Sequence, residues 1–225
     1  MILASALVVK KIFHRQNFYL KCTRLWAKNN VLLLKYLCAV DYKIIGQENV
    51  PAGNFVAVSK HQSTWECYFL YSFLPNYPVA VSKVEILFLP VFGPALKHIG
   101  TLSINRRGGA DSMKKILEGS REFMKEGRNV FIVFPQGTRV PVDSSPRDYP
   151  YRAGFIGIAK VNKLDILPIS LDSGKFWAKG MFVKKSGTIT VKIMPPLRYE
   201  EYKDMDKDRI AKYVEDAIEN NQESV

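Results

Sequence analysis

A histidine and a glutamate, His61 and Glu66, stand five residues apart between a β-prone run and an apolar, aromatic run. Imidazole and carboxylate form the pair that general acid–base chemistry uses, because histidine titrates near neutral pH and a carboxylate orients it. On one continuous helix, residues five apart point about 140° away from each other. The two side chains therefore meet only if His61 lies in the turn before a helix and Glu66 lies in its first turn.

Ser63 governs how this turn closes. It can cap a helix that begins near Thr64, which leaves His61 on the loop and lets the carboxylate reach the imidazole. The segment from Ser63 to Glu66 also fits a capping box, in which the glutamate only bonds back to the serine backbone amide. On this segment alone, the catalytic pair and the helix cap are equally good interpretations.

Further polar motifs follow predicted strands at their carboxyl ends, where α/β sheets usually build their sites. Lys83 ends one such strand, and Asn105 and Arg106 follow another. The guanidinium of Arg106 is a planar fork of donors that matches a phosphate, and Lys83 is a compact charge beside it. Together they suit a small phosphorylated ligand, although each alone is equally well explained as a solvated surface charge.

The strand expected at residues 130–134 runs into the sequence Phe-Pro-Gln-Gly-Thr-Arg. Pro135 ends the strand, and Gly137 permits a positive φ angle or a close backbone approach. Gln136, Thr138 and Arg139 then project polar groups into one cleft. The alternative is a plain polar turn.

The elements that position these motifs alternate between short β-prone runs and helical stretches from residue 42 onward. This alternation predicts an α/β fold with a mixed, largely parallel sheet flanked by helices. We expect strands at residues 55–58, 79–82, 101–104, 130–134, 166–171 and 188–194. Pro168 lies inside one of them, which indicates an edge or bulged position because proline cannot donate to the ladder.

Helices are expected between the strands. The clearest begins at Asp111 as N-cap and stops at Gly127. Pro90, Gly93 and Pro94 should break the apolar run 86–96 into short helical pieces.

The chain has 225 residues, and its 33 basic against 21 acidic residues give a net charge of +12. This balance suggests an anionic partner, either lipid headgroups, a phosphorylated substrate or nucleic acid. Dispersed Lys and Arg and the lack of a familiar module rank nucleic acid low, so we expect no nucleic-acid partner. The histidines are far apart and no metal-ligand, P-loop, dinucleotide or serine-hydrolase motif is present, so no metal or cofactor is expected. Cys22, Cys38 and Cys67 are expected to be buried free thiols of a reducing compartment.

Residues 1–40 mix basic side chains with aromatic and aliphatic ones. Such a composition suits helices that lie in a membrane interface, and it equally suits an amphipathic helix pair packed on the domain. No uninterrupted run reaches the ~20 apolar residues of a membrane-spanning helix. Residues 1–9 make a poor signal peptide and fit the end of a longer hydrophobic helix. We therefore predict a membrane-associating segment at 1–40 and one domain at 41–225.

In their order, these motifs resemble those of the PlsC-like 1-acyl-sn-glycerol-3-phosphate acyltransferases, within the glycerolipid acyltransferase superfamily. The first family motif, His-x4-Asp or Glu, resembles His61 to Glu66, and residues 103–106 are similar to the next one, of Phe-Ile-Asp-Arg type. The third, Phe-Pro-Glu-Gly-Thr-Arg, is similar to residues 134–139, and the proline-bearing fourth to 167–169. The resemblance covers about residues 50–171, and its first and third motifs are the most specific.

Two positions depart from the family pattern. Asn105 replaces the usual acid and Gln136 replaces the usual glutamate, so a role that needs negative charge at either position is in doubt. Both amides keep an acceptor and gain donors. Lys83 matches a lysine of many members, and residues 151–154 resemble the basic-glycine turn before the fourth motif.

The resemblance implies transfer of an acyl group from acyl-CoA or an acyl carrier protein to the sn-2 hydroxyl of 1-acyl-glycerol 3-phosphate, which forms phosphatidic acid. In this scheme His61 is the general base and Glu66 orients it, as an acid does in a triad. Lys83 and Arg106 grip the phosphate, Arg139 assists or binds the donor, and backbone amides near Gly137 are candidates for the oxyanion hole.

Two alternatives stay open. One is acylation of another lysolipid or of glycerol 3-phosphate, and the other is a basic membrane-binding module without catalysis. In each case we expect contact with anionic membrane lipids, at the cytoplasmic face of a membrane such as the bacterial inner membrane.

Overall fold

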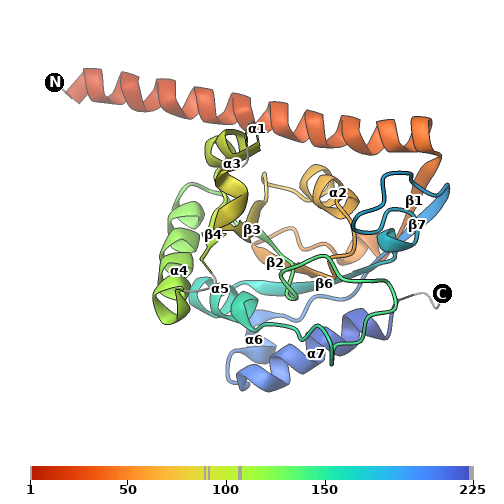
Figure 1. Cartoon of the computed structure of the whole chain (residues 1–225). Helices are drawn as coiled ribbons and strands as arrows, with labels where there is room; N and C mark the ends of the chain where they lie inside the picture. The colour runs from red at the N-terminus through yellow and green to blue at the C-terminus, as the bar shows by residue number, and fades with distance from the viewer. Residues whose placement is uncertain (1, 89, 91, 106–107, 223–225) are drawn as a thin grey trace.

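Seven strands form one twisted sheet in the computed structural model, which describes residues 2–88, 90, 92–105 and 108–222 (Figure 1). Their order across the sheet is β1-β7-β6-β2-β5-β3-β4. The strands are β1 (Val40–Ile45), β2 (Phe55–Ser59), β3 (Val79–Lys83), β4 (Leu102–Ile104), β5 (Val130–Val133), β6 (Asp165–Leu171) and β7 (Gly187–Ile193). All neighbours are parallel except β6 and β7. The predicted α/β class with a largely parallel sheet is confirmed.

Helices cover both faces of this sheet (Figure 1). One face carries α1 (Ile2–Cys38), α2 (Trp65–Phe73) and α3 (Phe92–Ile99). The other carries α4 (Gly109–Lys125), α5 (Gly154–Asn162) and α7 (Lys207–Glu219). Short helical turns complete the chain: η1 (Gln47–Asn49), η2 (Val84–Phe88), η3 (Ser173–Lys175) and α6 (Tyr199–Tyr202).

The central strand β2 shows why the sheet needs two helical layers. Every residue of β2 is buried, and its side chains alternate between the two faces. Val56 and Val58 pack in the cluster that includes residues of α5 and α7. Phe55 and Ala57 pack in the cluster that includes residues of α2 and α1. The apolar run thus holds both layers together, as expected for a buried parallel strand.

Six of the seven strands match the expected positions within a residue or two. The missed strand is β1, which lies at the edge of the sheet and pairs only with β7. Its sequence, Val-Asp-Tyr-Lys-Ile-Ile, is half polar because much of an edge strand faces water. Because of this polarity, the sequence did not predict β1, which lies at the predicted domain boundary.

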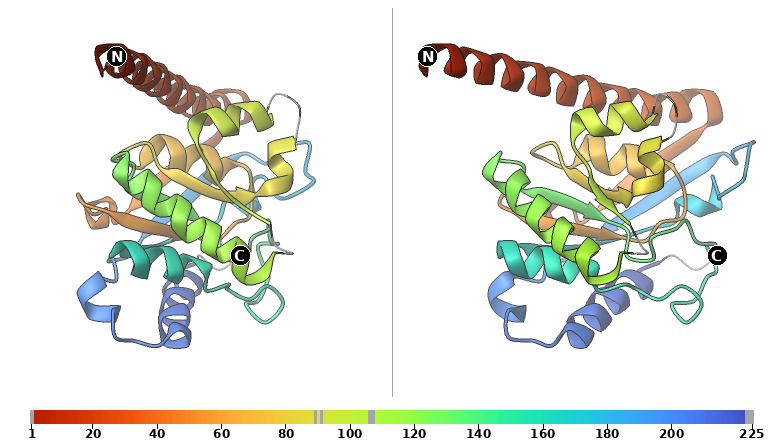
Figure 2. Two further views of the ribbon diagram at one scale, coloured as in Figure 1. Left: turned by 90° about the vertical axis from the view of Figure 1, so that its left-hand side faces the viewer. Right: turned by 60° about the vertical axis from the view of Figure 1, so that its left-hand side comes forward.

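The N-terminal segment is one continuous helix, α1, and the prediction of a helix pair is wrong. Among residues 17–38, whose side chains the structure describes, Leu20, Ala27 and Val31 are buried and recur at helical spacing along the face that packs on α2 and α3. The N-terminal half of α1 extends beyond the body of the molecule (Figure 2). Along the described part of the chain, no helix has the length and apolar composition that a bilayer crossing requires.

Helix α4 begins earlier than predicted. Gly108 is its N-cap, so Asp111 lies in the first turn, where its charge still complements the helix dipole. The predicted stop is confirmed, because Gly127 has φ +77° and its N–H donates to the Met124 carbonyl. The run 86–96 divides between η2 and α3, as its prolines and glycine suggested.

Pro168 lies in an interior strand, so the predicted edge position is wrong. β6 pairs with β2 on one side and β7 on the other. The Pro168 carbonyl accepts from the Met194 N–H, and the N–H that proline lacks would point toward this same neighbour. The segment opposite β6 has one extra residue at this point: Ile193 lies opposite Ile169, and Leu197 lies opposite Ile166. The bulge that was expected therefore lies on the chain opposite the proline.

Candidate active site

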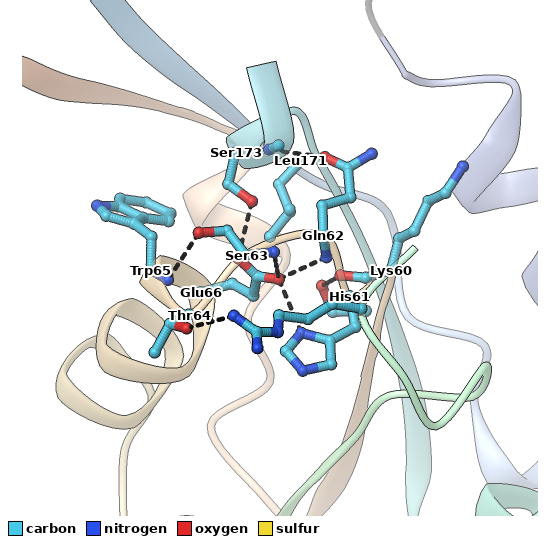
Figure 3. Close-up of polar contacts among 12 residues, drawn as sticks. Lys60, His61, Gln62, Ser63, Thr64, Trp65, Glu66, Leu171 and Ser173 are labelled. Carbon is cyan, nitrogen blue, oxygen red and sulfur yellow. Dashed lines mark hydrogen bonds and ion pairs between the residues drawn. The ribbon is translucent and has the colours of Figure 1, made fainter. Parts of the chain in front are cut away.

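The connection between β2 and α2 holds His61 outside the helix and Glu66 inside its first turn. β2 ends at Ser59 and α2 begins at Trp65, so the histidine lies on the turn. The Ser63 hydroxyl accepts the N–H of Trp65 at 3.0 Å and stabilises the start of the helix. In this arrangement His61 Nδ1 lies 2.8 Å from Glu66 Oε1 (Figure 3).

Glu66 is fully buried and receives four hydrogen bonds. Its Oε1 accepts from His61 and from the backbone N–H groups of Gln62 and Ser63, the latter two at 2.6 Å. Its Oε2 accepts from the Ser173 hydroxyl at 2.7 Å. A buried carboxylate needs such compensation. The two interpretations of the sequence therefore hold together, because the glutamate bonds to the Ser63 amide and to the histidine at once.

Ser173 was missed in the sequence. It lies in η3, just after β6, so it also follows the carboxyl end of a strand. Its position after a buried strand was the available signal, as for Lys83 and Asn105. Gly174 of the same turn donates its N–H to Gln62 Oε1 at 3.1 Å, which ties η3 to the histidine turn by a second bond.

Two contacts hold the imidazole of His61: the contact of Nδ1 with Glu66, and a stack on the Phe134 ring with centroids 4.2 Å apart. The backbone of His61 is held as well, because its carbonyl accepts the Val140 N–H at 2.7 Å. Because Nδ1 faces a carboxylate, we assign the proton to Nδ1 and leave Nε2 as an acceptor. The side chain is 17% exposed. This geometry suits a base that takes a proton from a molecule arriving at the open edge of the ring.

The segment after β5 packs against the histidine turn. Gly137 has φ +66°, in the left-handed region that the sequence suggested for it. Its N–H donates to the Phe134 carbonyl at 2.9 Å, so this amide closes the turn and does not point to an oxyanion. Arg139 Nη1 donates to Thr64 Oγ1 at 3.0 Å, while Thr138 is half-buried. Arg139 thereby stabilises Thr64, the N-cap of α2.

Gln136 points away from a plain turn into a buried polar cluster. Its side chain is 5% exposed and acts on the Tyr151 hydroxyl, whose pKa it lowers against the larger effects of burial and Glu219. That hydroxyl in turn donates to Glu219 at 2.8 Å. Burial, and then the Glu219 carboxylate, raises the pKa of Tyr151. The phenol therefore stays a neutral donor.

Lys83, one of the two proposed phosphate ligands, lies at the same carboxyl edge of the sheet. Lys83 ends β3 and pairs with Ile104 of β4, so Lys83 and Asn105 follow neighbouring strand ends. The Asn105 N–H donates to Ser112 Oγ at 3.1 Å, which fixes the backbone before α4. Arg106 lies outside the described residues.

The cysteines form no disulfide among the described residues, and Cys67 follows Glu66 directly. Burial raises the pKa of the Cys67 thiol, and the Glu66 carboxylate adds to the rise. The thiol is therefore protonated and a poor nucleophile. Cys22 is exposed on α1, and Cys38 and Cys67 are half-buried, so the expectation of buried thiols is wrong for Cys22 and only partly met for the other two.

This geometry, an oriented histidine at a strand end with no activated nucleophile among the described residues around it, fits direct transfer to a hydroxyl. Comparison with known families agrees, because residues 41–172 match the family described as Acyltransferase. The chain belongs to the acyltransferase family.

Particular relatives carry a more specific name. The chain is 34% identical over 176 residues to the 1-acyl-sn-glycerol-3-phosphate acyltransferase of Pseudomonas aeruginosa, which covers 78% of this chain and 66% of that protein. It is 24% identical to the enzyme of that name from Saccharomyces cerevisiae, covering 81% of this chain and 59% of the relative. The chain thus spans less than two thirds of the length of these relatives.

A solved structure has the same fold. The crystal structure of the 1-acyl-sn-glycerophosphate acyltransferase PlsC from Thermotoga maritima superposes with a TM-score of 0.71. The match covers 97% of this chain and 86% of that one, at 21% sequence identity. At this identity the likeness speaks for the fold, and it includes the N-terminal helix within its coverage.

Proposed function

We propose that this chain transfers a fatty acyl group from an acyl thioester to the sn-2 hydroxyl of 1-acyl-glycerol 3-phosphate, which yields phosphatidic acid. The observation that carries the proposal is the contact between His61 Nδ1 and the buried Glu66 carboxylate. The names of the Pseudomonas and yeast relatives support the choice of acceptor. The donor is acyl-CoA or an acyl carrier protein.

His61 acts as the general base in this reaction. Its Nε2 takes the hydroxyl proton as the acceptor oxygen attacks the thioester carbonyl carbon. The imidazolium that forms is stabilised by Glu66, whose position is fixed by four donors. The C–S bond then breaks, and the leaving thiolate takes the proton back from the imidazolium. No covalent acyl-enzyme is required, since the acceptor hydroxyl is itself the nucleophile.

Lys83 and Arg106 bind the acceptor phosphate in this scheme. Lys83 ends the strand next to β5, and Arg106 follows the strand next to it. A phosphate held at that position would place the glycerol hydroxyl toward the histidine end of the sheet. Positioning of this kind can lower a reaction barrier by up to about 7–11 kcal/mol. Asn105 and Thr138 then contact the acceptor, and Arg139 supports the site through Thr64.

The membrane is the proposed setting, with α1 as the contact. Large apolar side chains of α1 remain exposed, and among them Tyr36 and Leu37 are each more than three-quarters exposed. With the net charge of +12, this face fits an anionic lipid surface. We place the enzyme at the cytoplasmic face of a membrane such as the bacterial inner membrane.

A matrix of acyl donors and acceptors, assayed with the wild type and with His61→Ala, tests the proposal. The wild type should favour 1-acyl-glycerol 3-phosphate, and His61→Ala should lose about 10²- to 10⁴-fold in rate while its melting temperature is kept. His14→Ala, the same substitution elsewhere, serves as the control. Near-full activity of folded His61→Ala would remove the base from the mechanism.

The same assay separates the alternatives. A preference for glycerol 3-phosphate or another lysolipid would keep the mechanism and change the acceptor. Vesicle binding by the wild type without transfer to any acceptor would favour a non-catalytic membrane module.

A further inference from the structure

A second buried polar cluster lies directly behind the histidine turn, and it joins four residues from distant parts of the chain. Lys60, the residue before His61, is 1% exposed, and its Nζ lies 2.9 Å from Glu219 Oε2. Glu219 Oε1 accepts from the Tyr151 hydroxyl at 2.8 Å. The Gln136 side chain of the third motif is 5% exposed and acts on the Tyr151 hydroxyl, whose pKa it lowers. We call Lys60, Glu219, Tyr151 and Gln136 the rear cluster.

Glu219 is the last residue of α7 and the carboxylate that compensates the buried Lys60 ammonium. Burying an unpaired charge is expensive, so this pairing constrains both partners. The other Nζ donors go to Gln222 Oε1 at 3.0 Å and to the Ser144 carbonyl at 3.3 Å. The C-terminal end of α7 is thereby fixed to the backbone that carries the catalytic histidine.

The same helix end also reaches the strand that precedes Ser173. Gln222 Nε2 donates to the Leu171 carbonyl at 3.4 Å, and Leu171 is the last residue of β6. Two strand ends that supply site residues, those of β2 and β6, are therefore tied to one helix terminus. A shift of that terminus would move Lys60 and the turn before Ser173 together.

Charge explains why position 136 is an amide here. The rear cluster holds one cation, Lys60, and one anion, Glu219, and is largely closed to water. A glutamate at position 136 would add a second carboxylate, because the Tyr151 hydroxyl between the two has one proton and already donates it to Glu219. Like charges in such surroundings repel strongly. The amide of Gln136 avoids this repulsion, since it can donate to the hydroxyl that Glu219 has oriented.

We propose that Glu219 is a positioning residue, which supplies from the C-terminal helix a partly buried negative charge between Lys60 and Tyr151, beside the Gln136 amide of the third motif. Through Lys60 it sets the backbone before His61, and through Tyr151 and Gln136 it sets the turn after β5. This inference rests on the proposed acyltransferase function for its kinetic readout. It does not rest on that function for its stability readout.

The test is a cycle of three variants: Glu219→Gln, Gln136→Glu and the double substitution. In Glu219→Gln the Lys60 charge loses its partner, so kcat should fall about tenfold with the donor KM unchanged, and the melting temperature should fall. Gln136→Glu should also lower both, because it introduces the second carboxylate. In the double variant one carboxylate is restored beside Tyr151, so the losses in kcat and in melting temperature should be clearly smaller than the sum of the two single-variant losses.

Asp216→Asn is the control. Asp216 lies three residues earlier on α7, its side chain is 46% exposed, and its ion pair is with Lys212 on the surface. It should keep the kcat and the melting temperature of the wild type. A merely structural role of α7 would lower stability in Glu219→Gln without the selective loss of kcat.

Additive losses in the double variant would overturn the proposal, as would a wild-type kcat in Glu219→Gln. If Glu219→Gln does not fold, folding of the double variant is the rescue, and failure of both to fold overturns the inference. Absence of acyl transfer in the wild type would refute the proposed function instead. The melting temperatures of the cycle would still report whether positions 136 and 219 exchange one charge.

Discussion

The turn between β2 and α2 and the outer face of α1 satisfy opposite requirements. In the turn, polar groups are buried and have partners: Glu66 is fully buried and receives four hydrogen bonds. On the outer face of α1, apolar groups are exposed, and Leu37 is 77% exposed. Within the described residues, no other element exposes as many large apolar side chains as α1.

The difference shows which region fixes geometry. Each buried polar group costs about 1–3 kcal/mol if it loses its partner, so the hydrogen bonds of the turn select one arrangement. Apolar exposure is non-directional and only favours an environment away from water. The hydrogen bonds of the turn therefore fix the geometry of His61 and Glu66, whereas the exposed apolar side chains of α1 only favour contact with an apolar environment.

The largest effect is expected from Glu66→Gln. The amide keeps one acceptor oxygen but brings N–H donors against groups that already donate, so it cannot serve His61, Gln62, Ser63 and Ser173 together. We expect kcat to fall about 10²-fold or more, because the imidazolium loses its counter-charge. Steady-state kinetics with 1-acyl-glycerol 3-phosphate measure this.

Glu122→Gln provides the comparison for that substitution, since Glu122 is exposed on α4 and pairs only with Lys125. It should match the wild type. If Glu66→Gln were as active as Glu122→Gln, the carboxylate charge would have no part in catalysis.

A smaller effect is expected from Ser173→Ala, which removes one of four donors to the carboxylate. Glu66 Oε2 is then buried without that partner, at a cost of about 1–3 kcal/mol in unfolding free energy. We expect kcat to fall roughly tenfold, because the three bonds to Oε1 still hold the pair. Chemical denaturation and kinetics on one preparation measure both quantities. Ser145→Ala, at an exposed loop hydroxyl, is the control, and equal behaviour of the two would show that Ser173 does not position Glu66.

Substitutions on the exposed face of α1 should separate membrane binding from catalytic activity. Replacing Leu33, Tyr36 and Leu37 by serine removes exposed apolar surface without touching the buried stripe of the helix. Binding to phosphatidylglycerol vesicles should weaken about tenfold or more, since each side chain contributes up to roughly 1.5–3 kcal/mol when transferred from water. Activity on a water-soluble short-chain acceptor should stay at the wild-type level.

Tyr213→Ser on α7 is the counterpart for this experiment, because Tyr213 is exposed on the opposite helical layer. It should leave vesicle binding unchanged. Weaker vesicle binding by Tyr213→Ser, or none lost by the triple variant, would assign the lipid contact to a different face.

The smallest effect is expected where α1 meets the edge of the sheet, at Lys35 Nζ of α1, which lies 2.9 Å from Asp41 Oδ2 of β1. The hydrogen bond from Lys35 holds the pKa of Asp41 below its ordinary value of 3.8. A lowered carboxyl pKa stabilises the fold above the unfolded value, and this contribution is lost as pH falls through the folded value. Between about pH 5 and pH 3, the melting temperature should fall slightly more steeply for the wild type than for Asp41→Asn. Parallel curves would mean that the pair does not contribute.

The sequence was informative where partners are close along the chain. His61 and Glu66 share one turn, so spacing and helix capping were enough to predict their contact. Ser173 reaches the same carboxylate from 107 residues away, and Glu219 reaches Lys60 from 159 residues away. Such contacts depend on strand order, in which β6 lies beside β2, and no local pattern of residues reports it.

The errors have the same physical origin. β1 was missed because an edge strand needs few apolar residues, and Pro168 was misplaced because its missing N–H is accommodated by a bulge on a different segment. The two-helix expectation for the N-terminal segment failed because no proline or glycine interrupts α1. Local composition predicted the elements well and their neighbours poorly.

The packing of α1 on α2 has a kinetic consequence. Trp26 of α1 meets Tyr68 of α2 edge to face at 5.1 Å, and Glu66 is in the first turn of that same α2. With α1 seated among lipids, as proposed, enzyme and acceptor meet by lateral diffusion in two dimensions. Turnover should then follow the mole fraction of acceptor in the bilayer, and dilution with inert lipid should slow it even when the amount of acceptor per volume is constant.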